Sequence, residues 1–234
     1  MRKGVQKIYK EVAETYESIN HILTFGLDIL WRNKALREIT RAEGQYWLDV
    51  CSGTGEMTRN LSHRADASTK IYSVDFSFPM LSRAIKKNYK HPVNFAIADV
   101  AHLPFPDETF DLVTISFSIR NLNLNREELL AHLREFCRIL KPGGQFLNLE
   151  TSQPSSKLLR KLFHFYIRKI VRPIGSFLSG SKAAYGYLAY TVPRFYPPEE
   201  FSSLLRQAGF SRAKYRSTFL SFAAIHLAHK SLGQ

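Results

Sequence analysis

Residues 46–55 read Tyr-Trp-Leu-Asp-Val-Cys-Ser-Gly-Thr-Gly, an apolar strand that leads directly into a glycine-rich turn and then a helix. Gly53 and Gly55 allow the backbone to turn sharply and to approach a ligand closely. A second acid, Asp75, ends the next predicted strand, where its carboxylate is placed to accept hydrogen bonds from ribose hydroxyls. The loop, the strand-end acid and the strand–helix order together predict a cofactor site.

The segments around this loop predict an α/β fold. Helices separate the short apolar strands that we expect at 46–51, 70–75, 93–98, 110–117 and 145–150. Strands that are apolar on both faces and alternate with helices form a mostly parallel sheet covered on both sides, a Rossmann-like arrangement. Thr58 replaces the third glycine of Gly-x-Gly-x-x-Gly, which counts against a dinucleotide as the ligand.

The chain, 1–234, is interpreted as a single domain. Apolar residues at helical spacing predict two helices before the first strand, and Asp28 is placed to cap the second. Segments 212–219 and 222–229 predict a terminal antiparallel hairpin. The four parts are an N-terminal helical cap (1–42), a cofactor-binding core (43–153), a helical insert that covers the substrate (154–196) and a C-terminal segment that completes the sheet (197–234).

The composition is that of a globular protein, with 44% hydrophobic and 23% charged residues. Cys51 and Cys137 lie far apart, which fits neither a disulfide framework nor a metal site, so we expect no metal and a reducing, cytoplasmic compartment. Cys51 is interpreted as a packing residue. The charged N-terminus does not resemble a signal peptide, and no apolar run approaches the length of a membrane span.

The net charge of +13 is concentrated in one part of the chain. No carboxylate occurs between Glu150 and Glu199, whereas eight lysines and arginines do. Such a charge can serve solubility alone, or it can attract an anionic membrane surface or a nucleic acid. We expect no nucleic-acid partner, because the chain has neither a target-base motif of the Asn/Asp-Pro-Pro-aromatic type nor an added nucleic-acid-binding domain.

Two further motifs resemble the signature set of class I methyltransferases. Residues 103–113 read Leu-Pro-Phe-Pro-Asp-Glu-Thr-Phe-Asp-Leu-Val, and residues 141–144 read Lys-Pro-Gly-Gly. The resemblance implies the class I methyltransferase fold with S-adenosylmethionine as cofactor. It also implies that Asp75 holds the ribose, that Asp99 or Val100 meets the adenine, and that the methionine end is lined by Asp49, Gly53, Thr54 and Gly55.

A closer resemblance covers nearly the whole chain. Residues 12–20 read Val-Ala-Glu-Thr-Tyr-Glu-Ser-Ile-Asn, and residues 114–121 read Thr-Ile-Ser-Phe-Ser-Ile-Arg-Asn. Both resemble the C-methyltransferases of ubiquinone and menaquinone biosynthesis, in which Ser116 occupies a position assigned to cofactor contact. The implied activity is C-methylation of a prenylated quinol ring, demethylmenaquinol or a related molecule.

The chain also departs from this family pattern. Residues 51–56 read Cys-Ser-Gly-Thr-Gly-Glu where the family usually has Ala-Gly-Gly-Thr-Gly-Asp, and His21 stands where an acid follows Asn20. Three alternatives stay open, the first motivated by these departures and the second by the basic charge balance. One is a methyltransferase of another small or lipid-like acceptor, one is a nucleic-acid methyltransferase or RNA-binding module, and one is a non-enzymatic cofactor-binding protein.

The expected reaction needs a proton acceptor and a group that stabilises a phenolate. Arg120 and Asn121 follow the fourth strand and are assigned to orienting the acceptor; the alternative for Arg120 is a surface arginine that forms a salt bridge to a helix. Glu56, with Arg120 as its partner, is the first candidate base, and an acid in the first turn of a helix is the alternative. His21 is the second candidate. Tyr16 either covers the cofactor or packs in a helix core.

The insert supplies the expected partners. In residues 157–172 the apolar side chains lie on one helical face and the basic ones largely on the other. Such a helix suits an anionic membrane surface and can also wall a groove for a prenyl tail. The alternative is that the apolar face packs on the sheet while the charges are solvated. A homodimer and peripheral membrane association complete the expectations.

Overall fold

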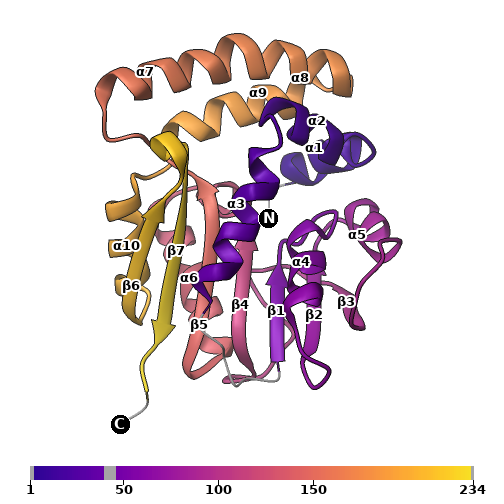
Figure 1. Ribbon diagram of the computed structural model, residues 1–234, viewed down its shortest axis with the longest axis vertical. Coiled ribbons are helices and arrows are strands. Elements are labelled where there is room, and N and C mark those ends of the chain that lie inside the picture. Colours follow the sequence, from indigo (N-terminus) through magenta and orange to yellow (C-terminus); the bar gives the residue numbers. More distant parts are fainter. Residues whose placement is uncertain (1–2, 40–45, 233–234) are drawn as a thin grey trace.

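A seven-stranded sheet runs through the centre of the molecule, with helices on both of its faces (Figure 1). The computed structural model describes residues 3–39 and 46–232. The sheet order is β3-β2-β1-β4-β5-β7-β6. Strands β1 to β5 are parallel, and β7 is antiparallel to both β5 and β6. This confirms the predicted mostly parallel sheet with a terminal antiparallel hairpin. The strands are β1 (Tyr46–Val50), β2 (Lys70–Asp75), β3 (Val93–Ile97), β4 (Phe110–Ser116), β5 (Leu140–Thr151), β6 (Phe210–Ser217) and β7 (Ala223–Lys230).

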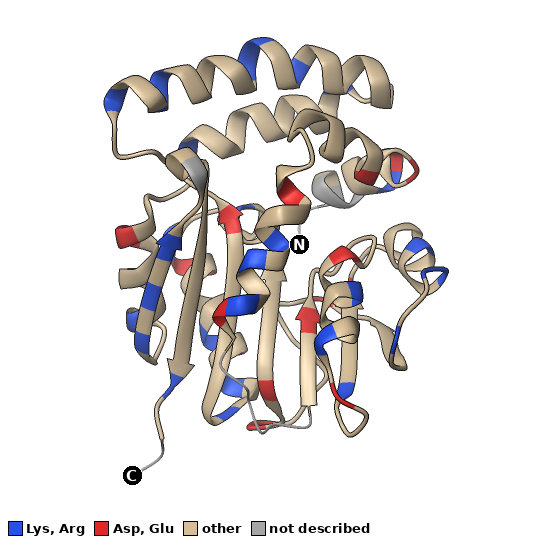
Figure 2. Cartoon of the chain, viewed as in Figure 1, with Lys and Arg blue, Asp and Glu red and all other residues tan. Residues whose placement is uncertain are grey.

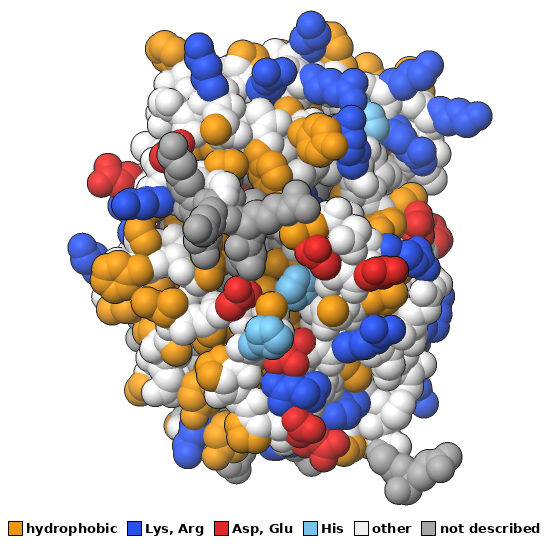
Figure 3. Space-filling model, turned by 180° about the vertical axis from the view of Figure 1, so that it is seen from behind, with side chains coloured by type: hydrophobic (Ala, Val, Ile, Leu, Met, Phe, Trp, Pro, Cys, Tyr) orange, Lys and Arg blue, Asp and Glu red, His pale blue; other side chains and the backbone are white. Residues whose placement is uncertain are grey.

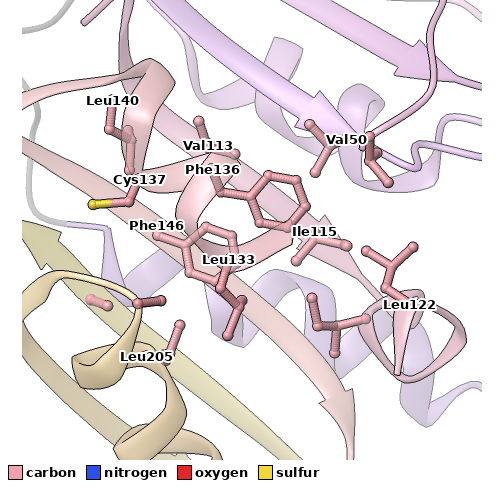
Figure 4. Close-up of a cluster of buried hydrophobic side chains, with 14 of the residues drawn as sticks. Val50, Val113, Ile115, Leu122, Leu133, Phe136, Cys137, Leu140, Phe146 and Leu205 are labelled. Carbon is pink, nitrogen blue, oxygen red and sulfur yellow. The ribbon is translucent and has the colours of Figure 1, made fainter. Parts of the chain in front are cut away.

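Two hydrophobic clusters attach helices to the two faces of the sheet. Val113 packs in the cluster under α6 and α10, whereas its neighbour Leu112 packs in the cluster under α3 and α4, because successive strand side chains point to opposite faces. On the first face, Phe136 of α6 stacks on Phe146 of β5, with ring centres 5.5 Å apart (Figure 4). A fifth helix, α5, packs beside β2 and β3. The helices around the sheet are α3 (Leu27–Glu38), α4 (Glu56–Arg64), α5 (Phe78–Ile85), α6 (Arg126–Ile139) and α10 (Pro198–Gln207).

The N-terminal cap contains three helices, so the expectation of two is wrong. A turn at residues 13–15 separates α1 (Lys3–Val12) from α2 (Tyr16–Leu23) before α3 begins. Asp28 does not cap α3, because Gly26, at φ 73°, takes the N-cap position. The Asp28 carboxylate instead accepts hydrogen bonds from three other side chains. The expected boundary between cap and core, at 42 and 43, lies outside the described residues.

The insert forms two layers of helix over the carboxyl ends of the parallel strands (Figure 1). A π turn, η2 (Ile167–Val171), joins α7 (Lys157–Tyr166) to α8 (Arg172–Ser179), and α9 (Lys182–Thr191) packs against α8. Cap and insert share a third hydrophobic cluster, in which Ile19 and Leu23 of α2 lie with Phe163 and Ile167. Short 3₁₀ turns are η1 (Ile119–Leu122), η3 (Val192–Arg194) and η4 (Phe219–Ser221). Among the described residues, no helix is long and apolar enough to cross a membrane.

Candidate active site

A cavity of about 460 Å³ lies where the carboxyl ends of the strands meet the helical cover. This edge of the sheet is where α/β folds bind ligands. The cavity has the size of a small-molecule site. Its wall is polar on the sheet side and apolar or aromatic on the cover side. The sheet side includes Asp49, Ser52, Gly53, Thr54, Asp75, Ser116 and Arg120, and the cover side includes Leu23, Leu162, Phe163, Tyr166, Ile167, Val171 and Leu188.

The glycine loop brings its backbone to Asp75. Gly53 and Gly55 both adopt positive φ, 57° and 82°. The Gly53 N–H donates to one oxygen of Asp75 and the Ser77 N–H donates to the other, each at 2.8 Å. A Cβ on Gly53 would meet no atom within 4 Å, so the loop leaves open space there. A Cβ on Gly55 would lie 2.8 Å from the Ala84 Cβ, so Gly55 is needed for packing against α5.

Two buried acids stand at the floor of the cavity. Burial raises the pKa of Asp75 to about 6, although the two backbone N–H groups oppose that shift. Burial likewise raises the pKa of Asp49 to about 6, against the hydroxyls of Thr58 and Thr114, which donate to it at 2.6 and 2.8 Å. Burial also raises the pKa of the Cys51 thiol, so Cys51 stays protonated and unreactive, in line with its interpretation as a packing residue.

Most of the expected cofactor residues come together in this cavity, and three do not line it. Tyr16 joins Asp49, Gly53, Thr54, Asp75 and Ser116 in the lining. Gly55 does not line the cavity and instead lies against Ala84 of α5. Asp99 and Val100 follow β3 at the same edge of the sheet, next to Asp75, whose carbonyl accepts from the Ala98 N–H at 3.2 Å. Their contact with adenine stays a prediction.

Arg120 is buried, and its partner is Glu150, not Glu56. Its Nη1 donates to Glu150 at 3.0 Å and to the Phe117 carbonyl at 2.8 Å, and both charged side chains are almost fully buried. Burial alone would lower the pKa of Arg120, but the charge of Glu150 raises it, so the guanidinium stays charged. The expected Arg120–Glu56 pair and the surface-arginine alternative are therefore both wrong. Strands β4 and β5 are neighbours, and that adjacency joins Arg120 to Glu150.

Asn121 is also buried and contacts the cap. Its Nδ2 donates to the Tyr9 hydroxyl at 2.6 Å, and the rings of Tyr9 and Tyr16 lie edge to face at 5.9 Å. Burial raises the pKa of Tyr9 well above its usual value, so this phenol remains neutral. Sequence reasoning missed Tyr9. No signal in the sequence could have found it, because the turn at residues 13–15 places Tyr9 and Tyr16 on different helices.

Glu56 lines the cavity but belongs to a different charge cluster from Arg120. The ammonium group of Lys87 bridges Glu56 and Glu17, and lies 2.7 Å from Glu17. Burial opposes ionisation of Glu17, but the hydrogen bond and charge of Lys87 lower its pKa. The ligand atoms of Glu17, His21 and Glu56 all lie within 4.8 Å of one another. Lys87 already supplies the cation that two such carboxylates need.

His21 is held by Asp28. The ring Nδ1 lies 2.8 Å from an Asp28 oxygen, and this carboxylate also accepts from Thr24 at 2.7 Å and from Arg32 at 2.6 Å. Burial alone would raise the pKa of Asp28, but these hydrogen bonds lower it, so Asp28 is ionised. The ionised Asp28 accepts a hydrogen bond from Nδ1, and the second ring nitrogen of His21 is Nε2. That Nε2 lies 3.9 Å from Glu56.

Comparison with known proteins matches this arrangement to one family. Residues 1–230 match the model of the ubiE/COQ5 methyltransferase family. The chain belongs to this family. It is 34% identical over 230 residues to a demethylmenaquinone methyltransferase of Staphylococcus saprophyticus, covering 98% of this chain and 97% of that protein. It is 35% identical over 232 residues to the ubiquinone/menaquinone biosynthesis C-methyltransferase UbiE of Geobacter sulfurreducens, covering 97% and 89%.

A solved structure agrees with the fold of this ubiE/COQ5 family member. A methyltransferase of Thermotoga maritima, described as S-adenosylmethionine-dependent and as a possible histamine N-methyltransferase, superposes with a TM-score of 0.68 at 18% identity, covering 96% of this chain and 99% of that one. At that identity the likeness shows the class I methyltransferase fold alone. The family shows that the chain is a methyltransferase and that S-adenosylmethionine is its methyl donor.

The residues present fit that donor. Each Asp75 oxygen accepts one backbone N–H and keeps a lone pair for a ribose hydroxyl. The hydroxyl oxygens of Ser52 and Ser116 are buried beside the cavity and have no hydrogen-bond partner among the described residues. Open space at Gly53 admits a ligand next to the loop. The acids Asp49 and Asp75 are suited to a donor that carries a positive charge.

Proposed function

We propose that this protein methylates a ring carbon of a prenylated quinol, demethylmenaquinol or a close relative, in the biosynthesis of a respiratory quinone. The observation that carries the proposal is the division of the cavity wall. A polar floor suits the cofactor and a dissociating phenol, and an apolar, aromatic roof suits a ring with a hydrocarbon tail. Relatives named for this chemistry match over nearly the full chain.

The chemistry requires the acceptor to become electron-rich. The bound donor supplies an electrophilic methyl group on a positively charged sulfur. Loss of a phenolic proton raises the electron density at the ortho ring carbon. That carbon forms the new carbon–carbon bond, while the electrons of the carbon–sulfur bond remain with sulfur, and loss of the ring proton restores the aromatic ring. Alignment of the two reactants contributes roughly 7–11 kcal/mol in favourable cases.

Arg120 and Asn121 are proposed to hold the acceptor. The Arg120 charge stabilises a phenolate in the low-dielectric cavity, and Glu150 keeps that charge in place without reaching the cavity wall itself. Asn121 is positioned by Tyr9, so the cap must be closed for this amide to be oriented. The Asn121 carbonyl oxygen is buried and has no partner among the described residues.

Glu56 and His21 are proposed to accept the proton. Glu56 lines the cavity, so it is proposed as the first acceptor, and the Nε2 atom of His21 lies 3.9 Å from its carboxylate. A proton taken at Glu56 can then pass to His21, whose positive charge Asp28 stabilises. General-base assistance of this kind is worth about 10²–10⁴-fold. In the His21→Gln variant, the rate of methyl transfer at pH 7 should therefore fall by at least about tenfold.

Three finer assignments belong to this proposal. The enzyme is proposed to act in the cytoplasm, to contact an anionic membrane peripherally, and to form a homodimer. The basic, apolar insert supports the membrane contact. Sedimentation of the purified protein would decide the proposed dimer.

The test is methyl transfer from labelled S-adenosylmethionine to a reduced, short-tailed demethylmenaquinone, with mass analysis of the product. A new carbon-bound methyl group is the expected result. Cofactor binding without transfer would overturn the acceptor and keep the donor.

A methyltransferase of another lipid-like acceptor is the second candidate. The His21–Asp28 pair favours it, because His21 replaces an acid at the edge of the site. A panel of prenylated phenols, compared by kcat/KM, would separate the two candidates.

A further inference from the structure

The outer side of the long insert helix carries an unpaired apolar stripe. Leu158, Leu162 and Phe165 follow i, i+4, i+7 spacing on α7, and Ile170, Ile174 and Phe177 repeat that spacing across η2 and α8. All six side chains are exposed, from 38% for Ile170 to 85% for Phe177. The inner side, with Phe163, Ile167 and Val171, already supplies the core contact. The packing of the insert on the rest of the protein therefore does not need the side chains of the stripe.

Cations surround this stripe and no acid balances them. Figure 2 shows blue segments along α7 and α8, and Figure 3 shows blue side chains among orange ones over the same end of the molecule. Among the described residues, none of these cations forms an ion pair with a carboxylate. The exposed ones are Lys157, Lys161, Arg168, Lys169 and Arg172.

The cavity opens at this same surface. Among the described residues that line it, only Phe25 and Leu162 are largely exposed, at 81% and 54%. Phe25 belongs to the turn after α2, and Leu162 belongs to the stripe. The Tyr166 hydroxyl donates to the Leu23 carbonyl at 2.6 Å, which ties α7 to the end of α2. Phe25 and Leu162 therefore mark the rim of the cavity.

We propose that the outer side of α7, η2 and α8 docks on an anionic lipid bilayer with the rim at Phe25 and Leu162 turned into the lipid. The ring of the acceptor then enters the cavity sideways from the bilayer, while its tail stays in lipid. The docking stands independently, and the tail path rests on the proposed function.

The chemistry of the face selects lipid over other partners. An RNA or DNA duplex would neutralise the cations but leave the apolar stripe in water. A second copy of the chain would cover the stripe but bring two basic surfaces together. An anionic bilayer accepts both, because apolar side chains enter the acyl boundary while lysines and arginines remain at the headgroups.

The first experiment is co-sedimentation of the full chain with vesicles of neutral phosphatidylcholine, with or without phosphatidylglycerol. The wild-type chain should bind the anionic vesicles and bind the neutral ones at least tenfold more weakly. Leu158→Ser should weaken binding by about tenfold, because this side chain would lose its place in the lipid. Leu232→Ser is the matched control, since Leu232 is at least as exposed as Leu158 but belongs to the C-terminal end, which lies far from α7 (Figure 1).

Charge reversal tests the cations in the same way. Lys161→Glu with Arg168→Glu should reduce binding by at least about a hundredfold. Arg212→Glu with Lys214→Glu on β6 changes the net charge equally and should have a much smaller effect. Equal losses of vesicle binding in the two double variants, or no binding by the wild-type chain, would overturn the proposal. Self-association without lipid that Leu158→Ser abolishes would make a second copy the occupant of the stripe and would overturn the proposal.

A depth measurement tests the rim. Trp31 and Trp47 are both buried, so their fluorescence should be insensitive to brominated lipids. Phe177→Trp and Phe25→Trp should each add a quenched signal on anionic vesicles, and Leu232→Trp should not. Quenching at position 177 without quenching at 25 would overturn the lateral entry.

Activity separates this inference from the proposed function. Leu158→Ser should leave transfer to a tail-less, water-soluble quinol unchanged and reduce transfer to a long-tailed quinol held in vesicles by about tenfold. Vesicle binding with no methyl transfer to any quinol would reject the proposed acceptor and keep the docking face. Transfer from vesicles that is insensitive to Leu158→Ser would reject the docking face and keep the acceptor.

Discussion

The two sides of the cavity are built on different physical principles. On the sheet side the important side chains are charged groups that are buried from solvent and held by hydrogen bonds. They are Asp49, Asp75, Arg120 and Glu150. On the cover side, the wall is a row of apolar and aromatic side chains that hold their places by packing.

This difference indicates which side of the cavity determines specificity for the methyl acceptor. A buried polar group that loses its partner is expensive, so the sheet side tolerates little change. Apolar walls accept exchanges of similar volume at less than about 1.5 kcal/mol. The sheet side is therefore suited to the unchanging cofactor, and the cover side to acceptors that differ between relatives.

The largest effect is expected from Glu150→Gln. This change leaves the buried Arg120 charge without its counter-ion, which costs about 3–5 kcal/mol of the free energy of unfolding. Asp107→Asn breaks the exposed pair with Arg138 and should cost no more than about 1 kcal/mol. Urea unfolding of the three proteins gives the comparison, and similar losses in both variants would remove the distinction drawn for the sheet side.

Asp75→Asn should come next. Replacing the carboxylate weakens two charge-assisted hydrogen bonds to a ribose, so cofactor affinity should fall by roughly a hundredfold, or about 3 kcal/mol. Asp99→Asn should cost less than about tenfold, because Asp99 is exposed and does not line the cavity. Titration calorimetry measures both, and the opposite ranking would move the ribose site to β3.

Gly175→Ala probes the cover. A Cβ there would lie 2.2 Å from the Tyr185 ring, so α8 and α9 must separate, and overpacking of this kind costs about 1–3 kcal/mol. Gly186→Ala is the control on α9, where a Cβ meets nothing within 4 Å and alanine should be neutral or slightly stabilising. Thermal unfolding would report both. A cover loose enough to absorb Gly175→Ala without loss would contradict the packing described here.

The smallest effect concerns pH. Asp75 has a pKa of about 6 in the ligand-free protein, so it is ionised above that pH and increasingly protonated below it. Cofactor affinity should be level above pH 6 and fall by up to about tenfold per unit below it. The contribution of Asp75 to the free energy of unfolding depends on pH in the opposite direction. Because the folded pKa exceeds the unfolded value, the stabilisation from Asp75 is complete below about pH 4 and is lost as pH rises through 6.

Calorimetry from pH 5 to 8 on the wild type and Asp75→Asn tests the binding half of this prediction. The wild type should show the steeper acidic fall, because Asp49, whose pKa is also about 6, remains in both proteins. The same slope in both proteins would assign it to another group.

The parts of the fold that follow from local pattern could be predicted. Five parallel strands, the glycine loop and Asp75 at a strand end all depend on neighbours within a few residues. The turn at 13–15 that divides the cap carries no proline or glycine and could not be seen. The strand expected at 145–150 is longer in the structure, because β5 begins at Leu140 and accommodates Gly143 at φ 76°.

The site was harder because its charges pair across strands and layers. Arg120 and Asn121 could be placed at the cavity from a motif, but the partner of Arg120 is 30 residues away on a neighbouring strand. The rule that identified Asp75, an acid at the end of a strand, would also have identified Glu150. Lys87 gave no comparable signal, because it reaches Glu56 only after α5 has packed beside the loop.

The π turn at residues 167–171 also limits how the gene can change. One turn of π-helix corresponds to a single residue added to an α-helix. In this chain it keeps Phe163, Ile167, Val171 and Gly175, spaced every four residues, on the buried side. Loss of any one residue there would rotate the distal half by about 100° relative to the proximal half. Substitutions along this helix can therefore accumulate gradually, whereas a one-codon deletion would need simultaneous compensation on both surfaces.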